Sequence, residues 1–335
     1  MKKRFFFNLY GYFALILFIL VTSFCSRSSR TPEKSEEKSY SSFTFFTMDT
    51  VVEVKYRGKN KSIENKIEKE FNRIYRKYSP SFKTSIISKL NSSNGPMKLD
   101  KETLFLIKKS IYFNKVSKGV FDITIKPLID IWGFEKGEKR VPAPETISRA
   151  LKFVSSIKIK IKDDGVYLPE GFKIDLGGIA KGYAVDRAAE IFLKSGVKNF
   201  LVNAGGDLVA RGVNDKGKNW VIGIQNPRGN GIVKIFSVKN KAVATSGDYQ
   251  RYFISDGVRY CHILSPFTGY PFRYWISMTV IAEDCTTADA LSTAFFGMER
   301  KDILKFVENN ESLKIRFFAI NPKLEIFTNF NKVEN

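Results

Sequence analysis

The chain has 335 residues, of which 43% are hydrophobic and 14% aromatic. This composition can bury a sizeable core and excludes a disordered protein. The net charge is +21, and since the first 40 residues contribute only +4, about +17 belongs to the rest of the chain. A basic surface favours anionic ligands or an anionic membrane. Neither a zinc-finger spacing nor a basic heptad region is present, so we expect no nucleic acid as a partner.

The N-terminal segment predicts export. Residues 2–4 are basic, and residues 5–24 then run for about the thickness of a membrane without a charge. Cys25 follows directly and resembles the cysteine of the lipobox of bacterial lipoproteins, which is lipidated after cleavage. Phe24 departs from that pattern, because a small residue is usual there. An uncleaved signal anchor is the alternative.

Either alternative places the protein outside the cytoplasm on a membrane. We therefore predict a signal peptide over residues 1–24, and a lipidated Cys25 with a flexible Lys/Glu/Ser-rich stalk over residues 25–42. A single folded domain is expected over residues 43–335. The expected location is the periplasmic side, with the chain held there by its lipid anchor.

Two further cysteines, Cys261 and Cys285, lie in the body of the chain. In an oxidising compartment they could form a disulfide. Their separation of 24 residues permits a bond but does not require one. The sequence leaves this pairing open.

The body shows no linker, low-complexity tract or internal repeat, which indicates one compact domain. Helical periodicity predicts helices over residues 61–79, 100–119, 144–154, 179–196, 286–298 and 300–310. Apolar runs and alternation predict strands over residues 47–56, 199–204, 207–212, 220–225, 232–238, 242–247 and 278–283, followed by a final hairpin. The predicted fold class is α+β: a mixed, mainly antiparallel sheet with flanking helices. A Rossmann fold is excluded, because no G-x-G-x-x-G follows a first strand.

The stretch IDLGGIAKGYAVD (174–186) predicts a turn that opens a helix. Gly177 and Gly178 would lie at the helix N-terminus, where free N–H groups and the helix dipole favour an anion. Lys181 in the first turn opposes that dipole, and an anionic ligand would relieve the conflict. An ordinary glycine connection with a solvated lysine is the alternative.

A second candidate site lies in CTTADALSTAFFGM (285–298). Thr286 and Thr287 are plausible N-caps. Asp289 and Thr293 are four residues apart and share a helix face. Their oxygens suit Mg²⁺. The alternative is an acid in the first helical turn beside an incidental threonine.

Two further residues complete the candidates. His262 is the one histidine of the chain and lies in a loop-like segment after a strand, which suits a site as well as a hydrogen-bonded structural role. Asp122 follows an aromatic residue in GVFDITIKPLIDIWGF (119–134), where a capped turn is the alternative.

The order of these segments resembles the ApbE family of FAD:protein FMN transferases. The resemblance spans residues 43–300 and includes MDT (48–50), YSPSFKTSIISKLN (78–91), VNAGGDLVARG (202–212), AVATSGDYQRYF (242–253) and HILSPFTGYP (262–271), besides the segments quoted above. It implies a membrane-tethered enzyme that uses Mg²⁺ to split FAD and joins FMN to a threonine or serine hydroxyl. The implied acceptor is a subunit of a redox complex, and AMP is released.

The resemblance also implies roles for individual residues. FAD-binding positions would be Met48 and Tyr78 at the flavin, Val120, Phe121 and Asp122 at the adenosine part, Asp175 and Lys181, and His262 and Ile263 beside the pyrophosphate. Metal-binding positions would be the Gly178 carbonyl, Asp289, Thr293 and, through its backbone, Ser292. His262 is the expected base, since Asp289 must be deprotonated to hold metal.

Two positions depart from the family pattern, because MDT replaces the usual MGT and Cys285 stands where a small residue is common. Two other functions share the same residues. One is an FAD pyrophosphatase that releases FMN and AMP, and the other is a non-catalytic flavin-binding lipoprotein. The metal-binding pair argues against a pure binder, which has no need of it.

Overall fold

The computed structural model describes residues 39–135 and 137–330. The predicted signal peptide, the lipidation site Cys25 and the stalk up to residue 38 lie outside these residues. Strand β1 (Tyr40–Thr47) begins three residues before the predicted domain boundary at residue 43, so residues 40–42 belong to the sheet and not to a stalk. Within the described part of the chain, no helix is long and apolar enough to span a bilayer.

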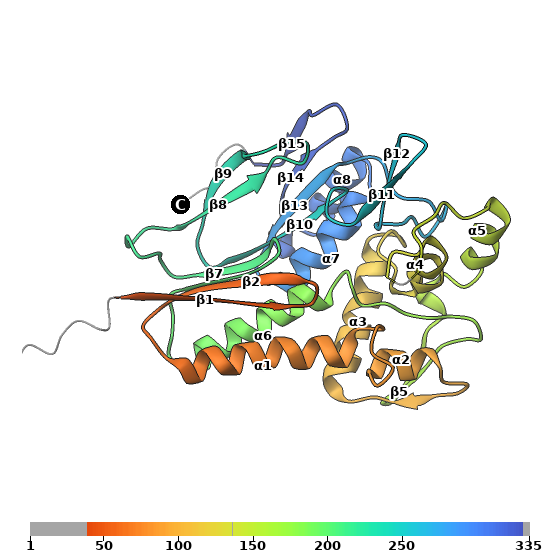
Figure 1. The fold of residues 1–335 in the computed structure, drawn as a ribbon, viewed down its shortest axis with the longest axis horizontal. Helices are drawn as coiled ribbons and strands as arrows, with labels where there is room; N and C mark the ends of the chain where they lie inside the picture. Colours follow the sequence, from red (N-terminus) through yellow and green to blue (C-terminus); the bar gives the residue numbers. More distant parts are fainter. Residues whose placement is uncertain (1–38, 136, 331–335) are drawn as a thin grey trace, which may run out of the picture. The chain divides into compact units, whose positions relative to one another are not determined.

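The centre of the fold is an eight-stranded sheet in the order β1-β2-β6-β7-β10-β13-β14-β15, with every neighbouring pair antiparallel (Figure 1). Its strands after β1 are β2 (Thr50–Arg57), β6 (Phe200–Ala204), β7 (Asp207–Arg211), β10 (Lys241–Gly247), β13 (Ser277–Ala282), β14 (Arg316–Ile320) and β15 (Ile326–Thr328). The predicted α+β class with a mainly antiparallel sheet is confirmed.

The prediction of one strand over residues 47–56 is wrong, because a hairpin turn lies inside it. Thr47 pairs with Thr50, and Met48 and Asp49 between them have φ of 50° and 58°. Such a two-residue turn requires positive φ at both central positions and matches the twist of the strands. Asp tolerates this conformation, which explains how MDT can replace MGT.

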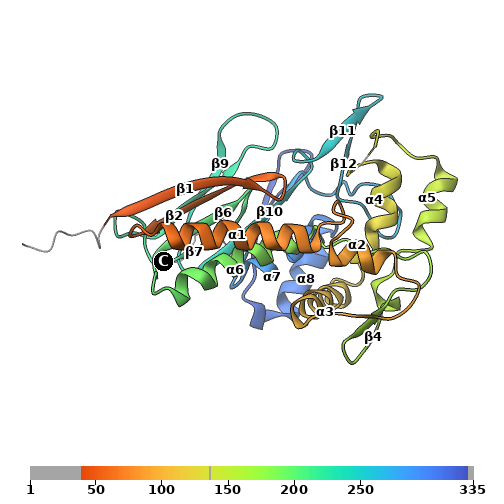
Figure 2. The same ribbon diagram turned by 60° about the horizontal axis from the view of Figure 1, so that its bottom comes forward.

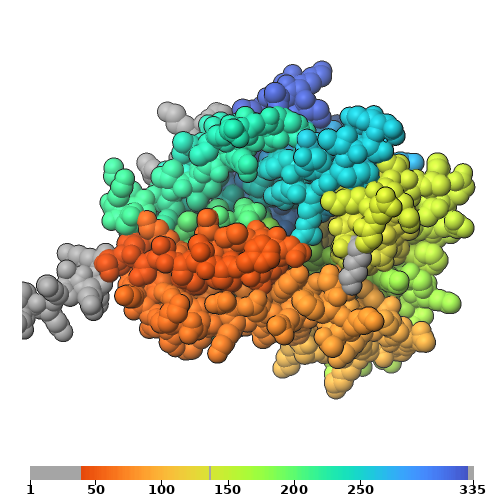
Figure 3. Space-filling model, viewed as in Figure 1, coloured from red at the N-terminus to blue at the C-terminus, as the bar shows by residue number. Residues whose placement is uncertain are grey.

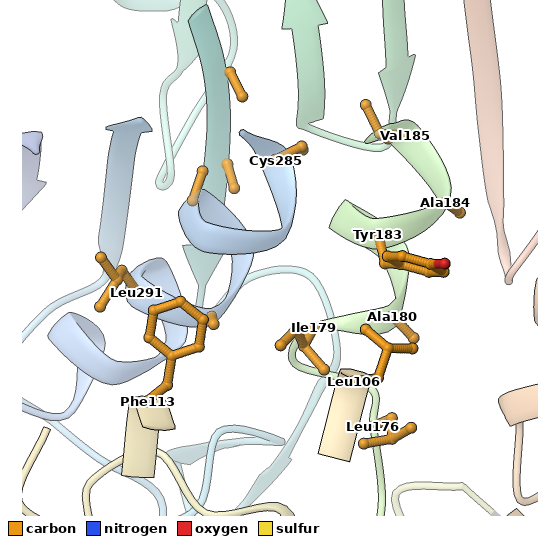
Figure 4. Packing of buried hydrophobic residues seen from close by; sticks show 14 of the residues in the cluster. Leu106, Phe113, Leu176, Ile179, Ala180, Tyr183, Ala184, Val185, Cys285 and Leu291 are labelled. Atoms are coloured by element: carbon orange, nitrogen blue, oxygen red, sulfur yellow. The ribbon is translucent and has the colours of Figure 1, made fainter. Parts of the chain in front are cut away.

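Three helices cover one face of the sheet: α1 (Lys61–Tyr78), α6 (Ala180–Lys194) and α7 (Cys285–Phe296) (Figures 1 and 2). Helix α3 (Lys101–Val116) packs beneath α7 and completes the core. Figure 4 shows side chains from α3, α6 and α7 meeting in this layer. The remaining helices are α2 (Ile86–Asn91), α4 (Lys126–Trp132), α5 (Pro144–Leu151) and α8 (Arg300–Asn309).

The other face of the sheet is covered by a hairpin made of β8 (Trp220–Gln225) and β9 (Ile232–Val238). Trp220, Ile222 and Phe236 pack there against apolar residues of the central strands. Two smaller sheets are formed by β11 (Tyr252–Ser255) with β12 (Val258–Cys261), and by β3 (Met97–Lys98), β5 (Gly165–Tyr167) and β4 (Lys160–Lys162). The sequence did not predict β11–β12, α2 or α4.

The two body cysteines do not pair. Cys261 ends β12 and Cys285 begins α7, and both are buried free thiols. Burial raises the pKa of Cys261 to about 11, so this thiol is protonated at neutral pH. No disulfide therefore joins Cys261 and Cys285, and both are unreactive residues of the core.

Candidate active site

A cavity of about 980 Å³ lies between the sheet, the β8–β9 hairpin and the segments that follow α1 and α3, and it appears as a hollow in Figure 3. This volume lies at the upper end of the range for sites that hold a small-molecule ligand. The predicted site residues that line it are Met48, Tyr78, Val120, Phe121, Asp122, Asp175, Gly178, Lys181, His262, Ile263, Asp289 and Thr293. Ser292, predicted as a ligand through its backbone, does not line the cavity, and its buried hydroxyl lies 2.8 Å from that of Ser246.

The Gly-Gly turn is held by Asp175, whose carboxylate accepts the Gly177 N–H at 2.5 Å. At Gly178 a β-carbon would lie 3.1 Å from the ring of Phe121 and 3.4 Å from the hydroxyl of Thr293. The contact with Phe121 is tighter than most real side chains make, whereas the one with Thr293 is at the edge of ordinary van der Waals contact. Glycine therefore lets the turn backbone approach Thr293, which brings two predicted metal positions together.

Helices α6 and α7 cross at Gly182, a residue that the sequence reasoning missed. A β-carbon there would lie 2.3 Å from the Cys285 carbonyl and 2.7 Å from the Cβ of Asp289. The close crossing lets the Gly182 N–H donate to the Asp289 carboxylate at 2.8 Å. The position of Asp289 therefore depends on the lack of a side chain on α6.

We expect Gly182→Ala to destabilise the fold by about 1–3 kcal/mol, the range for forcing extra atoms into a packed core. The FMN transfer that the resemblance implies should fall as well, because α7 must move and Asp289 moves with it. Denaturant unfolding and a transfer assay would measure both. Gly95→Ala is the matched control, since a β-carbon at Gly95 meets nothing within 4 Å. Parental behaviour of Gly182→Ala would contradict the crossing geometry.

Asp289 is 5% exposed, and its pKa is raised to about 8 by burial and then by the nearby Asp207 carboxylate. Lys181 and the Gly182 N–H only partly compensate. The carboxylate thus lies where a further positive charge would stabilise its ionised form.

The donor set fits a hard cation. The Asp289 carboxylate, the Thr293 hydroxyl and the backbone at Gly178 offer oxygen, and Ser246 lies 3.4 Å from the Thr293 hydroxyl. Mg²⁺ takes oxygen ligands and keeps several waters or substrate phosphates, so one carboxylate suffices. Within residues 39–135 and 137–330, no three His, Cys, Asp or Glu side chains gather as a metal site.

Lys181 is placed differently from the prediction. Its ammonium forms an ion pair with Asp207, a residue of β7 that is 2% exposed, and lies 3.3 Å from the Ala204 carbonyl. Burial lowers the pKa of Lys181, but the Asp207 and Asp289 carboxylates more than offset this, so the pKa is raised. The conflict with the helix dipole is therefore relieved by a protein carboxylate and not only by a ligand.

We expect Lys181→Ala to destabilise the protein by about 3–5 kcal/mol, because it leaves the buried Asp207 charge without its partner. The double variant Lys181→Ala/Asp207→Ala should recover much of this loss. Its affinity for FAD should still be weaker than the parent's by about 1–3 kcal/mol, the range for a charge-assisted hydrogen bond. An equal loss of riboflavin affinity would show that Lys181 does not interact with the diphosphate.

Asp122 lines the cavity, but its carboxylate is used within the protein. The carboxylate accepts hydrogen bonds from the backbone N–H and the hydroxyl of both Thr124 and Ser156, at 2.5–2.9 Å. It accepts another from the side-chain amide of Asn114, at 3.1 Å. With every lone pair occupied, this side chain organises the loop. The side chain of Asp122 therefore caps a turn, which was the alternative interpretation of this residue. Any contact with adenosine would have to come from the backbone.

Tyr78 is 2% exposed and closes α1 inside the core. Burial raises its pKa well above the usual range. The expected stacking of this ring on a flavin is therefore not supported, since almost no ring surface faces the cavity. Met48, half-buried at the tip of the β1–β2 hairpin, lies at the cavity edge with a strained positive φ.

His262 follows β12 and is half-buried at the cavity wall. Its Nδ1 lies 3.2 Å from the Arg251 carbonyl, which can only accept. Nδ1 therefore carries the proton in the neutral ring, and Nε2 keeps a free lone pair. Burial and then the charge of Arg251 lower the pKa of His262 to about 4. The imidazole is thus neutral over the physiological range.

Glu135 is a cavity residue that the sequence reasoning missed. Burial raises the pKa of Glu135 to about 7. Asp175 adds to this shift, first through a hydrogen bond and then through its charge. Lys126, 3.2 Å away, opposes this. Near neutral pH the Glu135 carboxyl is therefore protonated in part of the molecules and can then donate a hydrogen bond to a ligand. No motif signalled Glu135, since 40 residues separate it from Asp175.

The expected N-caps of α7 are also corrected. Asp284 is the N-cap, and its carboxylate accepts the Thr287 N–H at 2.7 Å. Asp186 on α6 accepts the Cys285 and Thr286 N–H groups, both at 2.8 Å. Thr286 and Thr287 lie inside the first turn, because two carboxylates satisfy its donors better than a hydroxyl. The same contacts bind α6 to α7.

Known proteins are similar to this chain in sequence and in fold. The ApbE family matches residues 48–317. The FAD:protein FMN transferase of Haemophilus influenzae is 33% identical over 285 residues, which cover 79% of this chain and 82% of that protein. The enzyme of the same name from Vibrio cholerae is 32% identical over 279 residues, which cover 79% and 83%.

Solved structures agree with the sequence comparison. The crystal structure of the ApbE protein of Thermotoga maritima has a TM-score of 0.81 at 40% identity and covers 86% of this chain and 96% of that one. The flavin transferase ApbE from Vibrio cholerae has a TM-score of 0.78 at 28% identity, with coverage of 87% and 96%. The chain belongs to the ApbE family.

Proposed function

We propose that this protein transfers FMN from FAD to a threonine or serine hydroxyl of a target protein, with Mg²⁺, and releases AMP. One observation carries the proposal: predicted site residues from six separate stretches of the sequence line a single cavity. The names of the relatives in Haemophilus influenzae and Vibrio cholerae support the same reaction.

In the proposed reaction the acceptor oxygen attacks the phosphorus that carries riboflavin. A new P–O bond forms to the acceptor, the P–O bond to the AMP phosphate breaks, and the acceptor proton goes to a base. Bound Mg²⁺ would supply charge neutralisation at the diphosphate, as in other phosphoryl transfers. Asp289, the Thr293 hydroxyl and the Gly178 carbonyl would hold it.

The chain's own groups position the reactants and move the proton. The free Nε2 of His262 can accept the hydroxyl proton, because its neutral form persists down to about pH 4. The Lys181 ammonium, held by Asp207, places positive charge beside Asp289. Glu135, with its pKa raised to about 7, lines the cavity beside Asp175 and can donate to or accept from the hydroxyl- or amine-bearing part of the nucleotide.

The direct test is to incubate the purified protein with FAD, Mg²⁺ and a threonine-bearing redox-complex subunit. The expected product is an acceptor with covalently bound FMN, seen by its fluorescence in a denaturing gel, together with one AMP per flavin. Free FMN with AMP would show a pyrophosphatase instead. Unchanged FAD would show a flavin-binding protein without this activity.

We further propose that the protein is exported and held on the periplasmic side by a lipid on Cys25. The basic residues 2–4 and the uncharged run 5–24 before this cysteine support the proposal. Mass spectrometry of the membrane fraction should find a diacylated N-terminal Cys25. Retention of residues 1–24 in the mature protein would favour the signal anchor.

A further inference from the structure

A second hollow continues from the site cavity across the outer face of the sheet. It has a volume of about 1020 Å³, and its lining includes Lys55, Trp220 and the β7–β8 loop. Leu201 and Val221 line both hollows. The two are therefore neighbouring parts of one surface, and we call the second part the acceptor groove.

Strand β8 forms one wall of this surface with an unpaired edge. All five consecutive residues from Val221 to Gln225 line the site cavity, although their side chains alternate between exposed and buried. Successive side chains of a strand point to opposite faces of the sheet, so a space that consecutive residues line lies along the edge of the strand. In the described part of the chain β8 pairs with β9 alone, so the backbone groups of its other edge are open to an added strand.

The opposite wall is the outer face of β2 and β6, where Lys55 pairs in register with Leu201. Val221, which lines both hollows, is 61% exposed. On the face of β2 that carries Lys55, Val51 is 51% exposed, and Phe46, which pairs with Val51, is 71% exposed. Exposed apolar groups beside a cavity are typical of a surface that another polypeptide covers.

The charge at the far end of the groove is positive. Lys55 is neutralised by Asp215 at 2.7 Å. Lys216 and Lys218 are exposed, and neither forms an ion pair with a carboxylate of the described residues, although the charge of Lys216 acts on Asp215. On a chain with a net charge of +21, these lysines favour acidic side chains in a partner.

From this geometry we propose that an extended, acidic segment of the acceptor protein binds in the acceptor groove. It adds as a strand to the free edge of β8, covers Val221, and places its acidic residues beside Lys216 and Lys218. Its hydroxyl side chain then enters the site cavity past Leu201. The inference rests on the proposed transfer reaction for its purpose, but the binding event can be measured without any chemistry.

The test uses a fluorescein-labelled twelve-residue peptide in which alternating valine and glutamate flank one central threonine. Fluorescence anisotropy should show that Lys216→Glu/Lys218→Glu weakens binding about tenfold, since two attractive contacts become repulsive. Lys66→Glu/Lys69→Glu is the matched control, because these exposed lysines lie on α1, which covers the other face of the sheet. The affinity of this control variant for the peptide should lie within about twofold of the parent's at the same ionic strength.

A second pair of peptides tests strand addition. Methylation of alternate amide nitrogens, in both phases, removes main-chain donors while keeping every charge. One phase should bind about tenfold more weakly, because an added strand uses every second N–H. Equal binding of both phases and the unmethylated peptide would overturn strand addition.

Two other results would overturn the proposal. One is unchanged peptide affinity in Lys216→Glu/Lys218→Glu. The other is loss of binding to phosphatidylglycerol vesicles in that variant without loss of peptide binding, which would make the lysines a membrane contact. Failure of the transfer reaction itself appears separately, as absence of flavinylated product with a peptide that still binds.

Discussion

Asp289→Ala is expected to abolish FMN transfer, with a loss of about 10³-fold or more, because metal-ion charge stabilisation supplies several kcal/mol in reactions of this class. Asp289 is the one carboxylate of the proposed metal set, and burial leaves it without enough positive charge of the protein's own. Transfer rates at ordinary Mg²⁺ concentrations measure the effect. Undiminished activity would remove Asp289 from the metal site.

Asp289→Asn separates the charge from the packing. The amide oxygen still accepts the Gly182 N–H, which alanine leaves unpaired inside the α6–α7 crossing. Activity should be lost as in the alanine variant, while the fold should be at least as stable as the parent's. An asparagine variant that keeps parental activity would show that the carboxylate charge is not needed.

Stability measurements give a readout that is independent of turnover. In the metal-free protein the folded-state pKa of Asp289 is about 8, above the unfolded value of 3.8. The folded state then binds more protons between these values, so its free energy of unfolding falls as pH rises from about 4 to 8. Asp289→Asn should lack this fall. Mg²⁺ should raise the melting temperature of the parent at pH 8 and leave that of the variant unchanged.

The sequence was sufficient to predict the main helices and to select residues that line one cavity. Apolar residues at helical spacing located α1, α3 and α6, each of which buries one face, and α7, which is buried on nearly all sides. The order of short motifs then predicted which residues would meet. Twelve of them line one cavity.

What the sequence could not predict depends on contacts between distant residues. The pairing of Lys181 with Asp207 crosses from α6 to β7. Glu135 meets Asp175 only after the chain has folded. Asp122 had a carboxylate of the right type for a nucleotide, yet local hydroxyl and amide groups occupy it. Periodicity and motif order contain no information about such partners.

The single histidine gives the sharpest test of the chemistry. If Nε2 of His262 takes the acceptor proton, His262→Asn should slow FMN transfer by about 10²–10⁴-fold, the usual contribution of a general base. FAD affinity should stay near the parent's, since the asparagine amide can still donate to the Arg251 carbonyl that Nδ1 contacts. A smaller loss with weaker FAD binding would indicate a positioning role.

The pH profile distinguishes the two roles further. An unperturbed imidazole titrates near pH 6.5, but burial and Arg251 lower the pKa of His262 to about 4. Parental transfer should therefore lose activity only as pH falls through about 4, where Nε2 becomes protonated, and this acid limb should be absent in His262→Asn. Circular dichroism and FAD binding at each pH would exclude acid unfolding as the cause. The chain holds no second histidine, so an identical acid limb in the variant would assign the proton to water.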